Sequence, residues 1–178
     1  MHPSSMNNMK KAKKIIHSSD DDAKWDILDV GGRSLDLKVQ NRSYSELFVN
    51  QTRNYFVSDL VAGPGVTHPM PGPYTLPFED DSIDLVLSGQ TLEHVKNPFR
   101  SVAEMCRVLK PDSYIILIAP SGGPRHDSID CWRFMDDGFK AIAEEVGLEV
   151  VSDWIDKSAP DERSRKWADH IFIGKKYD

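Results

Sequence analysis

The chain has 178 residues, of which 39% are hydrophobic and 28% charged, and its formal net charge is −6. This length is typical of one domain with its own core, and the acidic balance argues against a general nucleic-acid binder, which needs a basic surface. No apolar run approaches the roughly 20 residues that span a bilayer, and the N-terminus lacks the apolar segment of a secretory signal. We therefore expect a cytoplasmic protein with neither a membrane nor a nucleic-acid partner, of undetermined oligomeric state.

The cysteines and the N-terminal region give no sign of a metal. Cys106 and Cys131 stand in no spacing that holds an ion, so we expect two reduced thiols and no metal site. Residues 9–17 are predicted to form a short helix. We interpret residues 1–24 as an N-terminal lead-in segment and residues 25–178 as the functional domain.

The stretch WDILDVGGR, from Trp25 to Arg33, ends a short apolar run in an acid and two glycines. This pattern is typical of a buried strand that stops in a tight turn, where a ligand can approach bare backbone. A second apolar run, YFVSDL, also ends in an acid, Asp59. A glycine turn followed by an acid at the end of the next strand suits the hydroxyls of a ribose. The alternative for Asp59 is an ordinary turn residue.

The rest of the chain alternates strands with helices. Further strands are predicted from apolar runs at residues 84–88, 114–118, 148–151 and 170–173. One helix is predicted to begin at Pro98 and to end before residues 110–111, and another to be capped by Asp136 and closed by Gly147. Such alternation implies a mainly parallel sheet with right-handed crossovers, whose ligand site lies beyond the carboxyl ends of the strands.

Five stretches together resemble the class I S-adenosylmethionine-dependent methyltransferases, over about residues 25–174. They are ILDVGGR at 27–33, DLVAGPGV at 59–66, LPFEDDSIDLVLSGQTLEHV at 76–95, RVLKP at 107–111 and APSGGP…DCWRF at 119–134. Arginine after the paired glycines and the WRF loop look like one subgroup of that family. The resemblance implies a Rossmann-like three-layer α/β sandwich, with a mostly parallel sheet of about six or seven strands and an antiparallel C-terminal strand.

The resemblance also implies S-adenosylmethionine as cofactor and assigns residues to it. Asp29, Gly31 and Gly32 would form the floor under its methionine part. Asp59 would hold the ribose, and Leu60 would lie against the adenine.

Three more positions match the family's cofactor contacts, and two depart from its pattern. Leu76 sits where the family presents backbone to adenine, whereas Ser88 and Gln90 sit where backbone and side chain meet the cofactor's amino end. Arg33 replaces a further glycine and could fork onto the cofactor carboxylate, or could be a surface arginine at a helix start. Gly72 stands where many relatives have an acid for the adenine amino group.

Two histidines are candidates for a general base, which a hydroxyl acceptor would need. His126 lies in a loop beyond a predicted strand end, and we prefer it as the base. His94, on the first turn of a predicted helix, is the second candidate. The alternatives are a solvated loop histidine for the first and a packing or cofactor-edge residue for the second.

The segment around the WRF loop is the candidate acceptor pocket. Trp132 could present its indole face to a sugar or an aromatic ring, and Arg133 could bind a phosphate. Alternatively, Trp132 and Phe134 are core residues at alternate positions, with Arg133 paired to Asp130 or a neighbour.

The preferred interpretation is an S-adenosylmethionine-dependent methyltransferase that acts on an oxygen of a small-molecule or glycan acceptor. The departure at Gly72 motivates an alternative, a catalytically inactive cofactor-binding or scaffold protein with the same fold. A nicotinamide-dependent oxidoreductase is disfavoured, because the turn at Gly31 does not complete GxGxxG.

Overall fold

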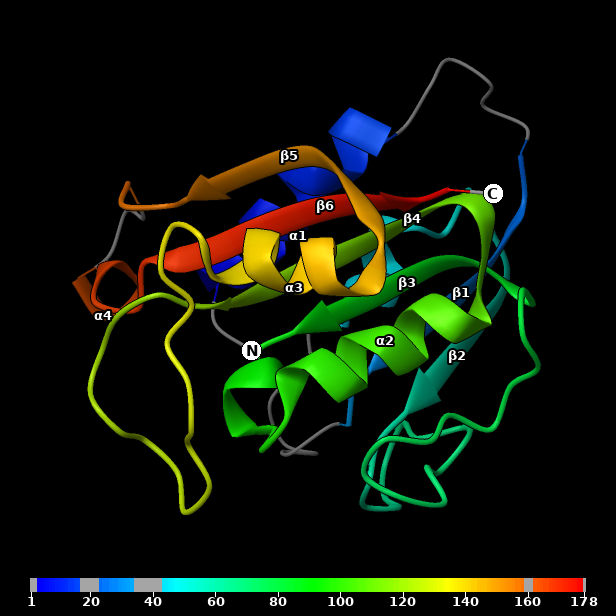
Figure 1. Ribbon diagram of the computed structural model, residues 1–178, viewed down its shortest axis with the longest axis horizontal. Helices are drawn as coiled ribbons and strands as arrows, with labels where there is room; N and C mark the ends of the chain where they lie inside the picture. The colour runs from blue at the N-terminus through cyan, green and yellow to red at the C-terminus, as the bar shows by residue number, and fades with distance from the viewer. Residues whose placement is uncertain (1–2, 17–22, 34–42, 159–161, 178) are drawn as a thin grey trace.

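The computed structural model describes residues 3–16, 23–33, 43–158 and 162–177 (Figure 1). Its centre is a six-stranded sheet in the order β2-β1-β3-β4-β6-β5. The strands are β1 (Trp25–Val30), β2 (Thr52–Ser58), β3 (Ile83–Gly89), β4 (Leu109–Pro120), β5 (Leu148–Ile155) and β6 (Asp169–Lys176). Within these ranges no helix is long and apolar enough to cross a membrane.

Strand direction divides the sheet into two parts. β1 pairs in parallel with β2 and β3, and β3 pairs in parallel with β4. β6 runs antiparallel to both β4 and β5. This confirms the predicted α/β sandwich with a mostly parallel sheet and an antiparallel C-terminal strand.

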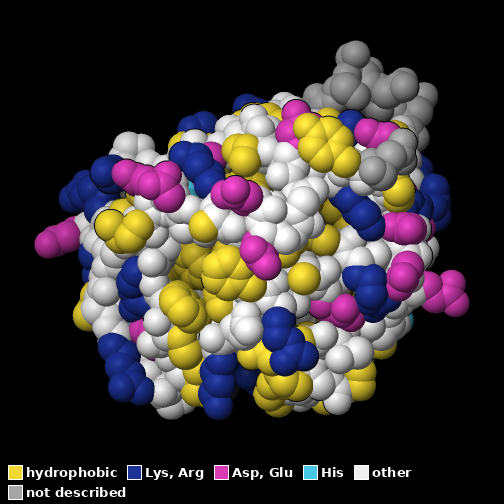
Figure 2. All heavy atoms as spheres, viewed as in Figure 1, with side chains coloured by type: hydrophobic (Ala, Val, Ile, Leu, Met, Phe, Trp, Pro, Cys, Tyr) yellow, Lys and Arg dark blue, Asp and Glu magenta, His cyan; other side chains and the backbone are white. Residues whose placement is uncertain are grey.

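Helices cover both faces of the sheet, which makes three layers (Figure 1). α1 (Pro3–Ile16) packs on one face, where Met9 and Ile16 join a core with Ile27 and Leu85. α2 (Pro98–Val108) and α3 (Gly138–Val146) cover the other face. Figure 2 shows this second face, on which apolar side chains gather centrally among charged ones. Shorter elements are η1 (Tyr44–Leu47), η2 (Leu92–His94) and α4 (Glu162–Arg165).

Several element boundaries differ from the sequence expectation. The N-terminal helix begins at Pro3 rather than at residue 9, because Met6 and Met9 also face the sheet. α3 has Asp137, not Asp136, at its N-cap, whereas Gly147 closes it in the left-handed conformation as predicted. The assignment of residues 1–24 as a separate lead-in stays a prediction.

Two polar segments of the sequence lie wholly or mostly outside the described residues: the acidic run 20–22, and residues 35–48, which we expected might be helical. The end of the second segment forms η1. The last two strands are longer than the predicted ranges 148–151 and 170–173, and β5 extends far enough to include Trp154.

Candidate cofactor and acceptor site

The parallel strands β1 to β4 end along one edge of the sheet, which we call the strand-end edge. Their last residues are Val30, Ser58, Gly89 and Pro120. Hydrogen bonds join neighbouring ends: Gly31 N–H donates to the Ser58 carbonyl at 2.7 Å, and Gln90 N–H donates to the Ile118 carbonyl at 2.8 Å. The edge therefore brings together the residues that follow each predicted strand.

The turn after β1 has room for glycine alone. Gly31 has a φ of +82°, and a Cβ there would lie 2.1 Å from Thr91 Oγ1. A Cβ on Gly32 would lie 2.7 Å from Asp29 Oδ2. Both distances are shorter than real Cβ contacts, so the turn keeps its backbone bare next to the buried acid.

Asp29 lies under this turn with only 3% of its surface exposed. Tyr55 donates a hydrogen bond from its hydroxyl to Asp29 Oδ2 at 2.9 Å. Burial raises the pKa of Asp29 to about 7, against the lowering effect of the Tyr55 hydrogen bond, and nearby Asp59 raises it further. Sequence reasoning placed Asp29 at the site but gave no sign of its tyrosine partner.

Asp59 follows β2 and is close to Arg33. Its Oδ1 accepts a hydrogen bond from Val61 N–H at 2.9 Å and lies 3.8 Å from Arg33 Nε. Arg33 Nε is buried and has no hydrogen-bond partner among the described residues. Arg33 is therefore partly buried and, within the described residues, not fully paired. Its guanidinium lies beside Asp59, the acid that was predicted to hold a ribose.

The two leucines of the predicted adenine site have opposite exposures. Leu60 is 55% exposed, whereas Leu76 is 3% exposed. Leu76 N–H donates to Glu104 Oε1 at 2.7 Å, and its carbonyl accepts from Arg107 at 3.2 Å. Glu104 of α2 therefore already occupies the backbone N–H of Leu76, whereas the Leu60 side chain is accessible.

The contact between Leu76 and α2 also joins two of the sequence motifs. Arg107, in RVLKP, reaches the carbonyls of Leu76 and Phe78 and pairs with Asp80, and all three of these residues belong to LPFEDD. Glu104 bonds Arg107 and the Leu76 amide at once. The helix thus fixes the course of the segment that leads into β3.

Ser88 and Gln90 lie at the end of β3 and form contacts within the protein. Buried Ser88 donates from its hydroxyl to the Val30 carbonyl at 3.0 Å, which ties β3 to β1. Gln90 has a φ of +58° and donates from its side-chain amide to Asp169 Oδ1 at 3.0 Å. Their predicted contacts with a cofactor stay predictions.

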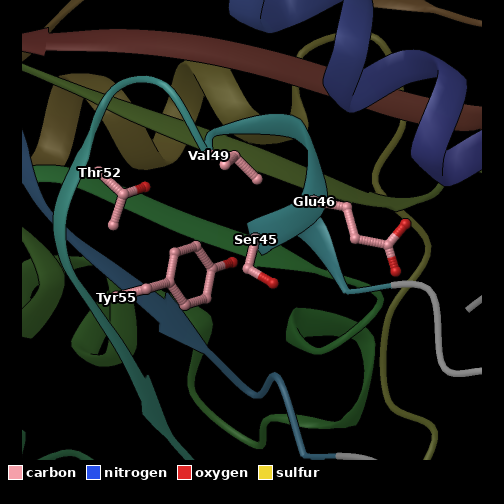
Figure 3. Close-up of a pocket in the computed structure, with 5 residues that line it drawn as sticks. All are labelled: Ser45, Glu46, Val49, Thr52 and Tyr55. Carbon is pink, nitrogen blue, oxygen red and sulfur yellow. The ribbon is translucent and has the colours of Figure 1, made fainter.

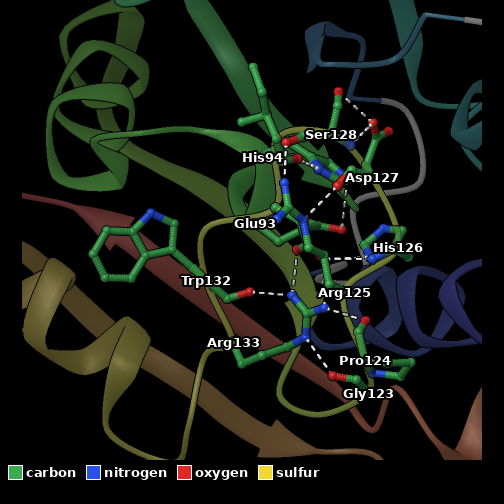
Figure 4. A network of polar contacts seen from close by, with 12 residues as sticks. Glu93, His94, Gly123, Pro124, Arg125, His126, Asp127, Ser128, Trp132 and Arg133 are labelled. Atoms are coloured by element: carbon green, nitrogen blue, oxygen red, sulfur yellow. Dashed lines mark hydrogen bonds and ion pairs between the residues drawn. The ribbon is translucent and has the colours of Figure 1, made fainter.

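Residues 121–137, which follow β4, form what we call the acceptor loop, and Arg133 holds it together. All five guanidinium N–H groups are used: they donate to the carbonyls of Gly123, Pro124 and Trp132 and to both carboxylate oxygens of Asp130 (Figure 4). The guanidinium holds the pKa of Asp130 well below its usual range. The expected alternative, pairing with Asp130, is confirmed, and no donor remains for a phosphate.

The two aromatic residues beside Arg133 differ from each other. Phe134 is buried and stacks on Phe139 of α3 with ring centroids 4.6 Å apart. Trp132 is 41% exposed, its ring points away from the Arg133 network, and its Nε1–H donates to the Val95 carbonyl at 2.8 Å (Figure 4). The alternative that both are core residues is therefore right for Phe134 and wrong for Trp132.

The two candidate bases meet at the acceptor loop. The rings of His94 and His126 lie 4.9 Å apart between centroids. His94 Nδ1 contacts the Ile129 carbonyl at 2.5 Å, and His126 Nδ1 contacts Asp130 Oδ2 at 3.0 Å. Sequence reasoning treated these histidines separately, because they are far apart in the chain.

Glu93 lies beside this pair and had no predicted role. Its side chain is 1% exposed, its Oε1 lies 3.6 Å from His94 Nε2, and neither carboxylate oxygen has a hydrogen-bond partner among the described residues. Burial raises the pKa of Glu93 to about 7. The one sequence feature that could have indicated a role for Glu93 is its position directly before His94.

Two hollows lie near the site. One, of about 390 Å³, lies between η1 and β2 and is lined by Ser45, Glu46, Val49, Thr52 and Tyr55 (Figure 3). Tyr55 links it to the strand-end edge, through its hydrogen bond to Asp29. The other, of about 240 Å³, lies against the acceptor loop and includes Trp132 and Arg133.

Known proteins resemble this chain in sequence. A family described as methyltransferase domain matches residues 49–117. The biotin biosynthesis bifunctional protein BioHC of Teredinibacter turnerae is 26% identical over 136 residues, which are 70% of this chain and 21% of that protein. An uncharacterised methyltransferase of Mycobacterium avium is 45% identical over 53 residues, 27% of this chain and 21% of the relative. The chain thus spans about a fifth of these curated relatives.

A solved structure resembles the whole fold. It is the 1,6-didemethyltoxoflavin-N1-methyltransferase of Burkholderia thailandensis, with bound 1,6-didemethyltoxoflavin and S-adenosylhomocysteine. Its TM-score is 0.70 at 15% identity, over 98% of this chain and 80% of that one. The chain therefore has the fold of that methyltransferase, and its match to the methyltransferase domain family, over residues 49–117, includes Asp59, Leu76 and His94.

Proposed function

We propose that this protein binds S-adenosylmethionine at the strand-end edge and transfers its methyl group to an oxygen of a small-molecule or glycan acceptor. The observation that carries the proposal is the turn at Gly31 and Gly32, which no larger residue fits, between the buried Asp29 and the more accessible Asp59. The toxoflavin enzyme acts on a small molecule according to its name, which supports an acceptor of that class.

The residues at this edge fit the chemistry of that cofactor. When bound, S-adenosylmethionine supplies a methyl group on a sulfonium sulfur. The bare backbone of Gly31 would accept its methionine part, and ionised Asp29 would attract the ammonium. Asp59 Oδ2, which accepts no hydrogen bond from the described residues, would receive a ribose hydroxyl, and exposed Leu60 would cover the adenine.

Arg33 completes this arrangement. Its buried Nε lacks a hydrogen-bond partner within the described ranges, and such an orphaned donor costs roughly 1–3 kcal/mol. A carboxylate or ribose oxygen of the cofactor would satisfy it. The long 3.8 Å contact with Asp59 leaves the guanidinium able to take a second partner without leaving the acid.

For the acceptor, the chain supplies a wall and a base. The exposed ring of Trp132 would cover an apolar or sugar surface, and Arg133 would position the acceptor loop rather than touch the acceptor. Donation from His126 Nδ1 to Asp130 leaves Nε2 with the lone pair that removes a hydroxyl proton. His94, held by the Ile129 carbonyl, is the second candidate.

A cofactor-binding protein without turnover is the second candidate function. It is favoured by the contact of Arg33 with Asp59 and by the glycine at position 72, where no carboxylate can meet the adenine amino group. In that case the protein would bind the cofactor but would transfer no methyl group.

A turnover experiment separates the two candidates. The protein is incubated with S-adenosylmethionine and a panel of nucleotide sugars, glycans and small hydroxylated molecules, and S-adenosylhomocysteine is measured. We expect its formation with one acceptor class, and a decrease of about 10²-fold or more in His126→Ala, because the general base is lost. The control variant is His68→Ala, on a histidine of a separate aromatic cluster.

Turnover with an acceptor, lost in His126→Ala while cofactor binding is retained, supports methyl transfer with His126 as the base. Cofactor binding without product across the whole panel contradicts methyl transfer and favours the second candidate. Equal turnover in His126→Ala and the wild type contradicts the assignment of the base.

A further inference from the structure

The cluster of Glu93, His94 and His126 has a composition that methyl transfer by itself does not require. One ligand atom from each of the three side chains lies within 4.8 Å of the other two. Two imidazoles and one carboxylate are a typical ligand set for divalent first-row transition metals. The three residues come from η2 and from the acceptor loop, so the fold, not local sequence, assembles them.

The buried carboxylate is the strongest sign of a missing partner. Glu93 has a side-chain exposure of 1%, and neither of its oxygens has a hydrogen-bond partner in the described part of the chain. An ionised carboxylate loses its hydration on burial, which is costly unless a cation or donors replace the water. The positive charge of Arg133 lowers the pKa of Glu93, but every N–H of this guanidinium already donates a hydrogen bond within the acceptor loop.

Both histidines are held as metal-binding imidazoles usually are. A ligating histidine commonly donates its second ring nitrogen to a carboxylate or a backbone carbonyl, which fixes the tautomer and the ring orientation. His94 Nδ1 donates to the Ile129 carbonyl, and His126 Nδ1 donates to Asp130 Oδ2. In this tautomer Nε2 of each ring keeps a lone pair, and Nε2 of His94 lies 3.6 Å from Glu93 Oε1.

The surrounding charge also favours a cation. Asp127 interacts electrostatically with both histidines, and Asp130 adds a second carboxylate beside His126. The positive charge of Arg133 is neutralised by Asp130. Ligand atoms at about 2.1 Å from one ion lie within about 4.2 Å of each other, so binding would draw the cluster slightly together. His126, on a loop and one-third exposed, is placed to make that movement.

We propose that Glu93, His94 and His126 form a binding site for one divalent transition-metal ion, of the Zn²⁺, Co²⁺ or Mn²⁺ type. The proposal goes beyond methyl transfer and does not depend on it. An ion there would lie beside the acceptor loop, where it would coordinate an acceptor oxygen and lower its pKa. Because a coordinated imidazole has no lone pair to take a proton, the base role of His126 applies to the metal-free protein.

Calorimetry on the full chain tests this site without any cofactor. The protein is treated with a chelator, dialysed and titrated with Zn²⁺, and Co²⁺ provides a visible absorption spectrum that reports nitrogen and oxygen ligands. We expect one site whose affinity falls at least tenfold in Glu93→Gln and in His126→Asn. The matched control is His68→Asn, which replaces a histidine whose Nδ1 contacts Thr67, far from the cluster in sequence.

His126→Asn changes a loop residue, so it tests the site even if Glu93→Gln fails to fold, and melting curves check both variants. Loss of the site in His126→Asn with retention in His68→Asn supports the proposal. Absence of Zn²⁺ and Co²⁺ binding in the wild type would overturn it, and so would binding that survives unchanged in His126→Asn. Neither result bears on cofactor binding, which is measured separately.

Discussion

Among the carboxyl groups buried at the strand-end edge, Asp29 and Glu93 have opposite surroundings. Burial raises the pKa of each to about 7. Asp29 accepts a hydrogen bond from Tyr55, whereas Glu93 accepts none within the described residues. The protein itself compensates the first carboxyl, whereas the metal ion proposed above would compensate the second.

This contrast extends to the residues around each acid. In the cofactor half, which we define as Asp29–Arg33 and Asp59, atoms are packed so closely that two positions admit glycine alone. In the acceptor half, defined as Glu93, His94 and the acceptor loop, two imidazoles keep a lone pair each. The cofactor half, which we call the floor, has no room for larger side chains at its glycines. The acceptor half offers ligand atoms to a partner. Larger residues at the two glycines should therefore cost stability, whereas changes in the ligand set should mainly cost binding.

The largest expected effect is that of Gly31→Ala. The new Cβ would lie 2.1 Å from Thr91 Oγ1, in addition to the strain of a positive φ. We expect the free energy of unfolding to fall by about 5 kcal/mol, or folding to fail. The matched control is Gly147→Ala, which has φ +74° but no atom within 4 Å and should lose only about 1–2 kcal/mol. Equal losses in urea unfolding would contradict a tightly packed floor.

Asp29→Asn tests the pH dependence of the floor. The folded-state pKa of Asp29 is raised from 3.8 to about 7, so its stabilising contribution is full below the unfolded value and is lost as pH rises toward 7. The variant keeps an acceptor for Tyr55 but has no charge to bury. Relative to the wild type, it should gain up to about 3 kcal/mol between pH 5 and pH 8.

Urea unfolding at several pH values measures this difference. Asp112→Asn is the control, because the Asp112 side chain is 69% exposed. A stability difference between Asp29→Asn and the wild type that does not change with pH would contradict the raised pKa of Asp29.

The fold was largely predictable because strands covered on both faces have continuous apolar runs, as in Ile115–Ile118, all of them buried. Gly147 ended its helix as predicted, since its left-handed conformation depends on local sequence. The start of α1 was missed because its buried face includes Ser4, Ser5 and Asn8, polar residues without hydrophobic periodicity.

The site was predictable only where it follows the strands. Asp29 and Asp59 end apolar runs, so their place at one edge follows from a parallel sheet. The contacts of Glu93 with His94 and His126 join η2 to the acceptor loop, and nothing in the local sequence specifies such a distance. Both roles of Arg133, acceptor binding and pairing with Asp130, stayed open because sequence does not reveal that its five donors are used within its own loop.

The central claim is that the floor binds the cofactor through Asp59, and a melting experiment with S-adenosylhomocysteine tests it most directly. Saturating ligand, at about 100 times its dissociation constant, should stabilise the wild type by roughly 2.7 kcal/mol. Asp59→Ala should abolish the shift. Asp26→Ala should keep it, because Asp26 lies near the start of β1, at the opposite end of the strands from the strand-end edge. An unchanged shift in Asp59→Ala, or none in the folded wild type at millimolar ligand, would contradict the account.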